Sequence, residues 1–396
     1  MNKSKLIDRF FNYVKIDTQS DESSAASPST AKQHDLAKVL YAELEEMGAS
    51  DIYYDKEHCY LYASIPGVKP AIGFIAHMDT SPAVSGANVK PRIIENYDGN
   101  DSLLKTDDYP ELLNHIGENL IATDGTTLLG ADDKAGVAEI MNMAEYFLKN
   151  PEIAHREIRI AFTPDEEIGR GTDHFDIERF SAKEAYTVDG GKLGIIEYEN
   201  FNAAEAKIKV HGRSVHPGSA KGVMLNALTM AMEFNALLPE NERPEYTEGY
   251  EGFYFLESMK GDVENAELSY IIRDHDSDKF EKRKALMEAS LSFMNTKYPA
   301  GSFEIEMRDQ YYNMVTYMKD HMSLIENAKK AFEKLGVNVV CEPIRGGTDG
   351  AMLTYKGVPC PNLCTGGYNY HGRFEYASIE EMEKSSEALI EIAKMI

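Results

Sequence analysis

The sequence lacks long hydrophobic runs. Nowhere do 18 consecutive apolar residues occur, which is about the shortest run that makes a helix able to cross a bilayer. The first twenty residues are interrupted by Lys5, Asp8, Arg9 and Lys15, so they contain no apolar signal-peptide core. We therefore predict a protein without a membrane segment that stays in the cytoplasm.

Basic residues are scarce. The 396 residues include 41 Lys and Arg against 66 Asp and Glu, which gives a formal net charge of -25 at pH 7. Such an excess of negative charge disfavours contact with a phosphate backbone or an anionic lipid surface. We predict that neither nucleic acid nor membrane is a partner.

Cysteine is rare as well. The chain has four, at Cys59, Cys341, Cys360 and Cys364, and none forms a C-x-x-C pair. This is too sparse for a disulfide scaffold and lacks the spacing of a structural zinc site. We predict buried free thiols; the alternative is that Cys360 and Cys364 form a bridge or bind a metal.

What is present is ordinary for a folded protein, with 43% hydrophobic and 27% charged residues. Residues 29–48 carry apolar residues at helical spacing and end at Gly48, which predicts an amphipathic helix. Three short apolar segments, 71–79, 157–167 and 185–191, look like buried strands that end in acids or histidine.

A helix over 133–148 separates the first two of these strands. This alternation predicts an α/β catalytic domain with a mostly parallel sheet, in which ligands bind beyond the carboxyl ends of the strands. From about Ala203 amphipathic strands and two helices predict an inserted, smaller α+β domain. The predicted division is 1–203, 204–316 and 317–396, with the first and last parts forming one domain.

Acids and histidines gather at the predicted strand ends. His77 and Asp79 are two residues apart and share a strand face, so Asp79 could hold one imidazole nitrogen of His77. Asp132 lies in the small-residue turn GADDKAG, where it suits either a helix cap or a ligand between two metals. In TPDEE, Glu167 could bind a metal while Glu166 serves as a general base; the alternative is a solvated acidic loop.

Asp189 closes the third strand, and His371 lies near the C-terminus. Taken singly, each suits a turn or a hydrogen-bonded core position. Together with the other candidates they make a set of two histidines and three carboxylates, which suits zinc or a related divalent ion. Two such ions could share one carboxylate, as in aminopeptidases and other hydrolases.

Seven motifs follow one another between residues 77 and 376: HMDT, TLLGADDKAG, TPDEEIGRG, TVDGG, HPGSAKG, RGGTDG and GYNYHGRFEY. In this order they resemble the M20 family of metallopeptidases. The resemblance implies one ion held by His77, Asp132 and Asp189, and a second held by Asp132, Glu167 and His371. The expected cofactor is two zinc ions per subunit, with cobalt or manganese as alternatives.

The resemblance also implies roles for residues around the ions. Glu166 would be the general base, and Asp79 would orient His77. The family often has a cis peptide after the bridging aspartate, which here is the Asp132-Asp133 bond. The inserted domain would be a lid whose strands often pair between subunits, so a homodimer is expected.

Three lid-side residues match substrate-binding motifs. By resemblance, His216 would stabilise the carbonyl oxygen of the substrate, and Arg273 would grip its carboxylate. Gly347 lies in the RGGTDG loop, where glycine lets a peptide approach closely. The alternatives are a surface turn for His216 and, for Arg273, an exposed ion pair with Asp274 or Asp276.

The motif set is most similar to the aminopeptidases of this family that act on tripeptides. Asp189 supports this branch, because acyl- and carboxypeptidase relatives tend to carry Glu there. The expected activity is zinc-dependent release of the N-terminal residue from a tripeptide. The alternatives are an amidohydrolase or dipeptidase acting on N-acyl amino acids or dipeptides, and a catalytically silent metal-binding scaffold.

Overall fold

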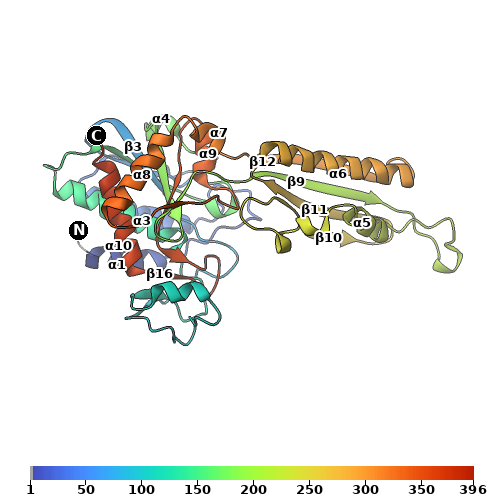
Figure 1. Ribbon diagram of the computed structural model, residues 1–396, viewed down its shortest axis with the longest axis horizontal. Helices are drawn as coiled ribbons and strands as arrows, with labels where there is room; N and C mark the ends of the chain where they lie inside the picture. Colours follow the sequence, from blue (N-terminus) through green and yellow to red (C-terminus); the bar gives the residue numbers. More distant parts are fainter. Residues whose placement is uncertain (1–2) are drawn as a thin grey trace. The chain divides into compact units, whose positions relative to one another are not determined.

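The computed structural model describes residues 3–396, which form two compact units (Figure 1). The first unit contains the chain up to Tyr198 together with Tyr317–Glu342 and Thr348–Ile396. The second contains Glu199–Thr316 and the short segment Pro343–Gly347. The functional division into a catalytic domain and a lid stays a prediction.

The first unit is built on a mixed eight-stranded sheet. Its strands, in spatial order, are β1 (Ser50–Tyr54), β2 (Leu61–Ile65), β6 (Arg156–Thr163), β3 (Val68–His77), β7 (Ala185–Gly190), β14 (Asn362–Cys364), β8 (Ile195–Glu197) and β13 (Val340–Cys341). The central strands β6, β3, β7 and β14 run parallel, whereas β1, β2 and β8 pair antiparallel with a neighbour. The parallel centre confirms the predicted α/β class.

Helix α3 (Ala131–Lys149) packs against β3 and β7 and against α1 (Lys3–Val14) and α10 (Ile379–Ala393). It is buried on nearly every side, and most of its residues are apolar or small, although Lys134, Glu139 and Asn142 are buried as well. Gly136 lets its first turn lie against β7, because a Cβ there would come 1.8 Å from the Val188 carbonyl oxygen. The close approach brings the start of α3 beside the end of β7.

The opposite face of the sheet is covered by α4 (Ile177–Phe180) and α9 (Asp349–Tyr355), which pack near β6 and β7. Gly73 of β3 faces the Phe180 ring, where a Cβ would come 2.4 Å from a ring carbon. Helices therefore lie on both faces, as a parallel sheet requires.

Helix α2 (Gln33–Met47) buries Leu36, Leu40 and Leu44 at helical spacing and packs against β1 and β2. It ends at Gly48, whose φ of 82° is the left-handed cap that the sequence predicted. The chain also forms α7 (Val315–Met318) and α8 (Met322–Lys334), and α8 lies beside α10 (Figure 1).

A small antiparallel sheet also belongs to the first unit. Its strands are β15 (Gly367–Tyr368), β16 (Tyr376–Ser378), β5 (Leu120–Ala122) and β4 (Arg92–Ile94), in that order. The loop between β15 and β16 carries His371, and the chain after β5 leads into the turn before α3. This sheet was not predicted from the sequence, and it places two distant segments side by side.

The second unit is a four-stranded antiparallel sheet with two helices. The strands are β10 (Phe253–Gly261), β11 (Asn265–Asp274), β9 (Asn202–His211) and β12 (Phe303–Tyr311), in that order. Burial alternates along β11, and α5 (Ala227–Asn235) and α6 (Ser277–Lys297) pack against it. One side of the sheet therefore forms the core of this unit.

Other predictions from composition can be compared directly. All four cysteines are free, and Cys59, Cys360 and Cys364 are buried, so the bridge between Cys360 and Cys364 is absent. Within residues 3–396, no helix combines the length and apolar character needed to cross a bilayer.

Candidate metal centre

The candidate site lies at the carboxyl ends of three neighbouring parallel strands. His77 ends β3, Asp189 is the fifth of the six residues of β7, and Glu166 and Glu167 open the short 3-10 helix that follows β6. Because β6, β3 and β7 are adjacent and parallel, their ends meet at one edge of the sheet. The apolar strand interiors fix the positions of these polar ends.

Asp132 reaches the same place from the start of α3. Its backbone and that of Asp133 are not helical, and the bond between the two residues is cis, which confirms the expectation from the family. One carboxylate oxygen of Asp132 lies 2.8 Å from His77 Nε2, and the other lies 3.1 Å from His371 Nε2. The two oxygens thus face different histidines.

Two three-residue groups result, and they share Asp132. The inner group is His77, Asp132 and Asp189; the outer group is Asp132, Glu167 and His371. In each group the potential ligand atoms lie within 4.8 Å of one another. The structure thus brings together all five predicted ligands in the predicted combinations, and their binding of metal stays a prediction.

The two groups differ in solvent access. The His77 side chain is 2% exposed, whereas the His371 side chain, in a loop with a φ of 59°, is 48% exposed. Nε2 of His77 lies 3.3 Å from Asp189 Oδ1, and Nε2 of His371 lies 2.8 Å from Glu167 Oε2. The inner group is therefore enclosed, and the outer group meets the surface.

Burial and mutual repulsion shape the electrostatics of the cluster. Burial raises the pKa of Glu167 to about 7 and that of Asp189 to about 6, and the neighbouring Asp132 charge adds to both shifts. Hydrogen bonds to Asp132 and Glu167 raise the pKa of His371 to about 11. Concentrated negative charge therefore favours a cation at this place.

The donor set fits divalent metal ions. Among the side chains that the structure describes, no lysine or arginine forms an ion pair with Asp132, Glu167 or Asp189. The Oε1 atom of Glu167 is buried without a hydrogen-bond partner, which is costly unless a cation or water satisfies it. Imidazole nitrogens and carboxylate oxygens in this arrangement suit zinc and related ions.

Asp79 connects His77 to the acidic turn. A carboxylate oxygen of Asp79 lies 3.4 Å from His77 Nδ1, which agrees with the predicted pairing, and the Asp79 backbone oxygen is also 3.1 Å from that nitrogen. The same carboxylate accepts the backbone N–H groups of Glu166 at 3.0 Å and Glu167 at 3.2 Å. Such outer contacts orient the ligands that they support.

Asp165 is a supporting residue that sequence reasoning missed. It adopts a left-handed φ of 56°, and its carboxylate accepts hydrogen bonds from the Ser29 backbone and hydroxyl and from Gln33 Nε2. Ser29, in the polar segment that precedes α2, is buried and holds this turn. No local sequence pattern distinguishes Ser29 from Ser23 and Ser24, which are more exposed, so its contact with Asp165 could not be predicted.

Glu375 is a second missed residue. Its buried carboxylate accepts the backbone N–H groups of Leu129 at 2.7 Å, Gly130 at 2.8 Å and Asp132 at 3.1 Å. It follows His371 by four residues in the GYNYHGRFEY motif. Glu375 therefore ties the loop that carries His371 to the turn that carries Asp132.

We expect Glu375→Ala to lower zinc affinity about 10- to 100-fold, as loss of outer support for a metal ligand commonly does. The matched control is Glu380→Ala, since Glu380 caps the Asn119 backbone N–H at 2.9 Å but does not contact the Asp132 turn. Zinc retained during dialysis against a competing chelator measures the effect. Equal zinc retention by the two variants would contradict the role given to Glu375.

The predicted substrate-side residues His216, Arg273 and Gly347 lie in the second unit. His216 is exposed, and its Nδ1 accepts the Gly218 backbone N–H at 3.1 Å. Gly347 is close to the Tyr311 ring, 2.8 Å from where its Cβ would stand. These three residues belong to the second unit and the cluster belongs to the first, so their roles stay predictions.

Comparison with known proteins identifies the family. Residues 198–302 match the model of the M20 peptidase dimerisation domain. A protein named peptidase T from Geobacillus sp. (strain WCH70) is 52% identical over 405 aligned positions, covering 99% of this chain and 98% of the relative. Another, from Alkaliphilus oremlandii, is 50% identical and covers 98% of each chain. The chain belongs to the peptidase T family.

Solved structures agree with the fold of this family. Aminopeptidase PepT from Bacillus cereus superimposes with a TM-score of 0.78 at 24% identity, covering 100% of this chain and 98% of that one. A tripeptidase from Staphylococcus aureus gives 0.81 at 21% identity with the same coverage. As a member of the peptidase T family, the chain is a peptidase, and the M20 resemblance seen in the motifs is confirmed.

Proposed function

We propose that the chain is an aminopeptidase that uses two zinc ions to release the N-terminal residue from tripeptides. The observation that carries the proposal is the position of Asp132, which presents one carboxylate oxygen to each of two ligand groups. The proposed tripeptide preference is supported by relatives named peptidase T, which are 50% and 52% identical to this chain. A cytoplasmic location stays a prediction.

In this proposal the inner and outer groups each hold one ion, zinc or alternatively cobalt or manganese. The chemistry that such a pair supplies is the acidification of water and the polarisation of the scissile carbonyl. The protein sets the spacing between the two ligand groups, because both include the carboxylate of Asp132. It also contributes the enclosure of the inner group, which keeps bulk water away from His77 and Asp189.

Glu166 is the proposed general base. Its backbone is fixed by the Asp79 carboxylate, and burial, with the nearby acids Asp189 and Asp349, raises its pKa well above the usual range. No ion pair occupies its carboxylate among the described side chains, in contrast to Glu167. Glu166 takes a proton from the attacking water and returns it to the leaving amine.

Arg273 is the proposed contact for the substrate carboxylate. Its Nη1 donates to the Arg345 backbone oxygen at 3.0 Å, and its Nε is buried without a partner. Among the described side chains Arg273 forms no ion pair with Asp274 or Asp276: Asp274 pairs with Arg283 at 2.8 Å, and Asp276 caps α6. An arginine left without an acid suits bidentate binding of a carboxylate.

His216 and Gly347 complete the proposed substrate contacts, with His216 stabilising the carbonyl oxygen and Gly347 lying beside the peptide while the Tyr311 ring fills the space of its missing side chain. We also propose a homodimer formed through the second unit. Its support is the match of residues 198–302 to a peptidase dimerisation domain.

The test is mass spectrometry of products after the zinc-loaded protein is given four substrates. These are a free tripeptide, its N-acetyl form, the matching dipeptide and the matching tetrapeptide. We expect release of the N-terminal residue from the free tripeptide alone, because both charged ends are recognised. Protein carrying Glu166→Gln, purified in the same way, controls for contaminating peptidases.

Two outcomes would contradict the proposal. Cleavage of the acetylated peptide would show that no free amine is needed and would place the activity with the N-acyl amidohydrolases. Cleavage of the dipeptide and the tetrapeptide at the same rate as the free tripeptide would show that the enzyme does not select peptide length.

A further inference from the structure

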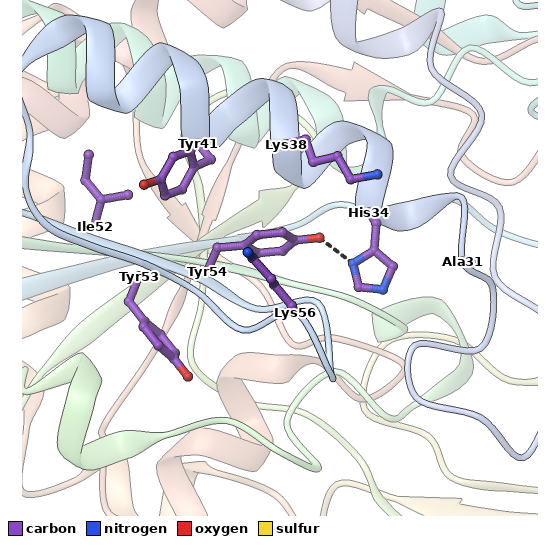
Figure 2. Close-up of a pocket in the computed structure, with 8 residues that line it drawn as sticks. All are labelled: Ala31, His34, Lys38, Tyr41, Ile52, Tyr53, Tyr54 and Lys56. Carbon is purple, nitrogen blue, oxygen red and sulfur yellow. Dashed lines mark hydrogen bonds between the residues drawn. The ribbon is translucent and has the colours of Figure 1, made fainter.

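A cavity of about 870 Å³ lies between helix α2 and strand β1 of the first unit (Figure 2). It is lined by Ala31, His34, Lys38, Tyr41, Ile52, Tyr53, Tyr54 and Lys56. On α2, Gln33 is buried and binds Asp165, whereas the next residue, His34, lines the cavity. The cavity is thus distinct from the candidate metal centre, and its volume is in the range of small-molecule sites.

The arrangement of the lining follows from secondary structure. His34, Lys38 and Tyr41 are spaced by four and three residues, so they share one face of α2. Ile52 and Tyr54 alternate along β1 and face the same side of the strand. Figure 2 shows the helical residues on one side of the space and Ile52, Tyr54 and Lys56 on the other.

The charged side chains that line the cavity are Lys38 and Lys56, both positive. The lining contains two lysines and a histidine but no Asp or Glu, in a chain whose net charge is -25. Lys38 contacts Asp35 at 3.2 Å, but both side chains are more than 60% exposed, so this pair is weak. Lys56 forms no ion pair with any side chain that the structure describes. The cavity therefore differs from the acidic surface around it.

His34 adds a hydrogen-bond donor. Burial and then the Lys38 charge lower its pKa, while burial raises the pKa of the Tyr54 hydroxyl well above its usual range. A neutral imidazole and a protonated phenol give one consistent arrangement, in which the Tyr54 hydroxyl donates to His34 Nδ1. The proton of that imidazole is then on Nε2, where it can be donated to a ligand.

We propose that this cavity binds a small molecule that joins a phosphate to a flat ring, of the nucleoside monophosphate class. The ammonium groups of Lys38 and Lys56 and the Nε2–H of His34 are donors that suit a phosphate. The rings of Tyr41 and Tyr54 offer apolar faces on which a base can stack, whereas the Tyr53 ring is covered by the Arg179 guanidinium, 3.7 Å from its centroid.

The experiment is equilibrium dialysis of the zinc-loaded protein with AMP, adenosine or inorganic phosphate. We expect saturable AMP binding that is at least about tenfold tighter than binding of adenosine or phosphate, because charge and ring are both recognised. The double variant Lys38→Ala/Lys56→Ala is expected to weaken AMP binding about tenfold or more. Both lysines are exposed, so the variant is expected to fold.

Lys90→Ala is the matched control, because Lys90 is an exposed lysine of the same unit far along the chain from the cavity lining. It is expected to bind AMP as the unaltered protein does. Unchanged AMP binding in the double variant would overturn the proposal, since it would assign the phosphate to another place such as the metal centre. Absence of saturable AMP binding at millimolar concentration, or equal binding of adenosine or of inorganic phosphate, would overturn it as well.

Discussion

Glu166→Gln is expected to lower kcat about 10²- to 10⁴-fold while the protein keeps its zinc, because removal of a general base costs about this much. Glutamine preserves the size of the side chain but cannot accept the proton of the attacking water. The backbone N–H of residue 166 would still donate to Asp79, so the turn that carries Glu167 is expected to stay in place.

Steady-state kinetics and zinc content, measured on the same preparation, check this prediction. The matched control is Glu167→Gln at the neighbouring position. Glu167 belongs to the outer group with Asp132 and His371, so this change is expected to lower zinc content as well as turnover. Near-normal turnover of Glu166→Gln would remove Glu166 from the role of base. Loss of zinc from Glu166→Gln would instead make it a metal ligand.

Asp132→Asn is expected to have the second large effect, with loss of both ions and a fall in kcat/KM on the order of 10³-fold or more, equivalent to about 4 kcal/mol of transition-state stabilisation. Asp132 is the one residue common to both ligand groups among the described residues. Asparagine presents one oxygen and one amide group, so it cannot offer an anionic oxygen to each side.

The zinc-to-protein ratio after removal of free metal distinguishes the shared residue from the others. We expect about two ions in the unaltered protein and close to none in Asp132→Asn, because metal ligation depends on an ionised carboxylate. Asp189→Asn and Glu167→Gln each belong to one group and are expected to keep about one ion. A ratio near one in Asp132→Asn would show that the carboxylate is not shared.

The strands that carry the site could be predicted because their signal is local. Segments such as AIGFIAHMD and EIRIAFTPDEE combine a continuous apolar run with an abrupt polar end, which is typical of a strand buried on both faces of a parallel sheet. The sheet order β6-β3-β7 then brings those polar ends together. Pairing of Asp132 with His77 and His371 was predicted only through the family resemblance.

The parts that were not predicted depend on contacts between distant residues. Strands β5 and β16 have three residues each and pair across roughly 250 residues of sequence, too short for a periodic pattern and too far apart for a turn signal. Glu375 and Asp165 are single acids in an acid-rich chain. Their importance comes from the backbone groups and side chains they meet after folding.

The order of the ligands along the chain has a consequence for biosynthesis. His77, Asp132, Asp189 and the strands β3, β6 and β7 all precede residue 191, whereas His371 and Glu375 come roughly 180 residues later. At ribosomal rates of about 5–20 residues per second, this gap corresponds to roughly 10–35 s. All residues of the inner group are therefore synthesised before His371 completes the outer group. Over the same interval β7 lacks its parallel neighbour β14.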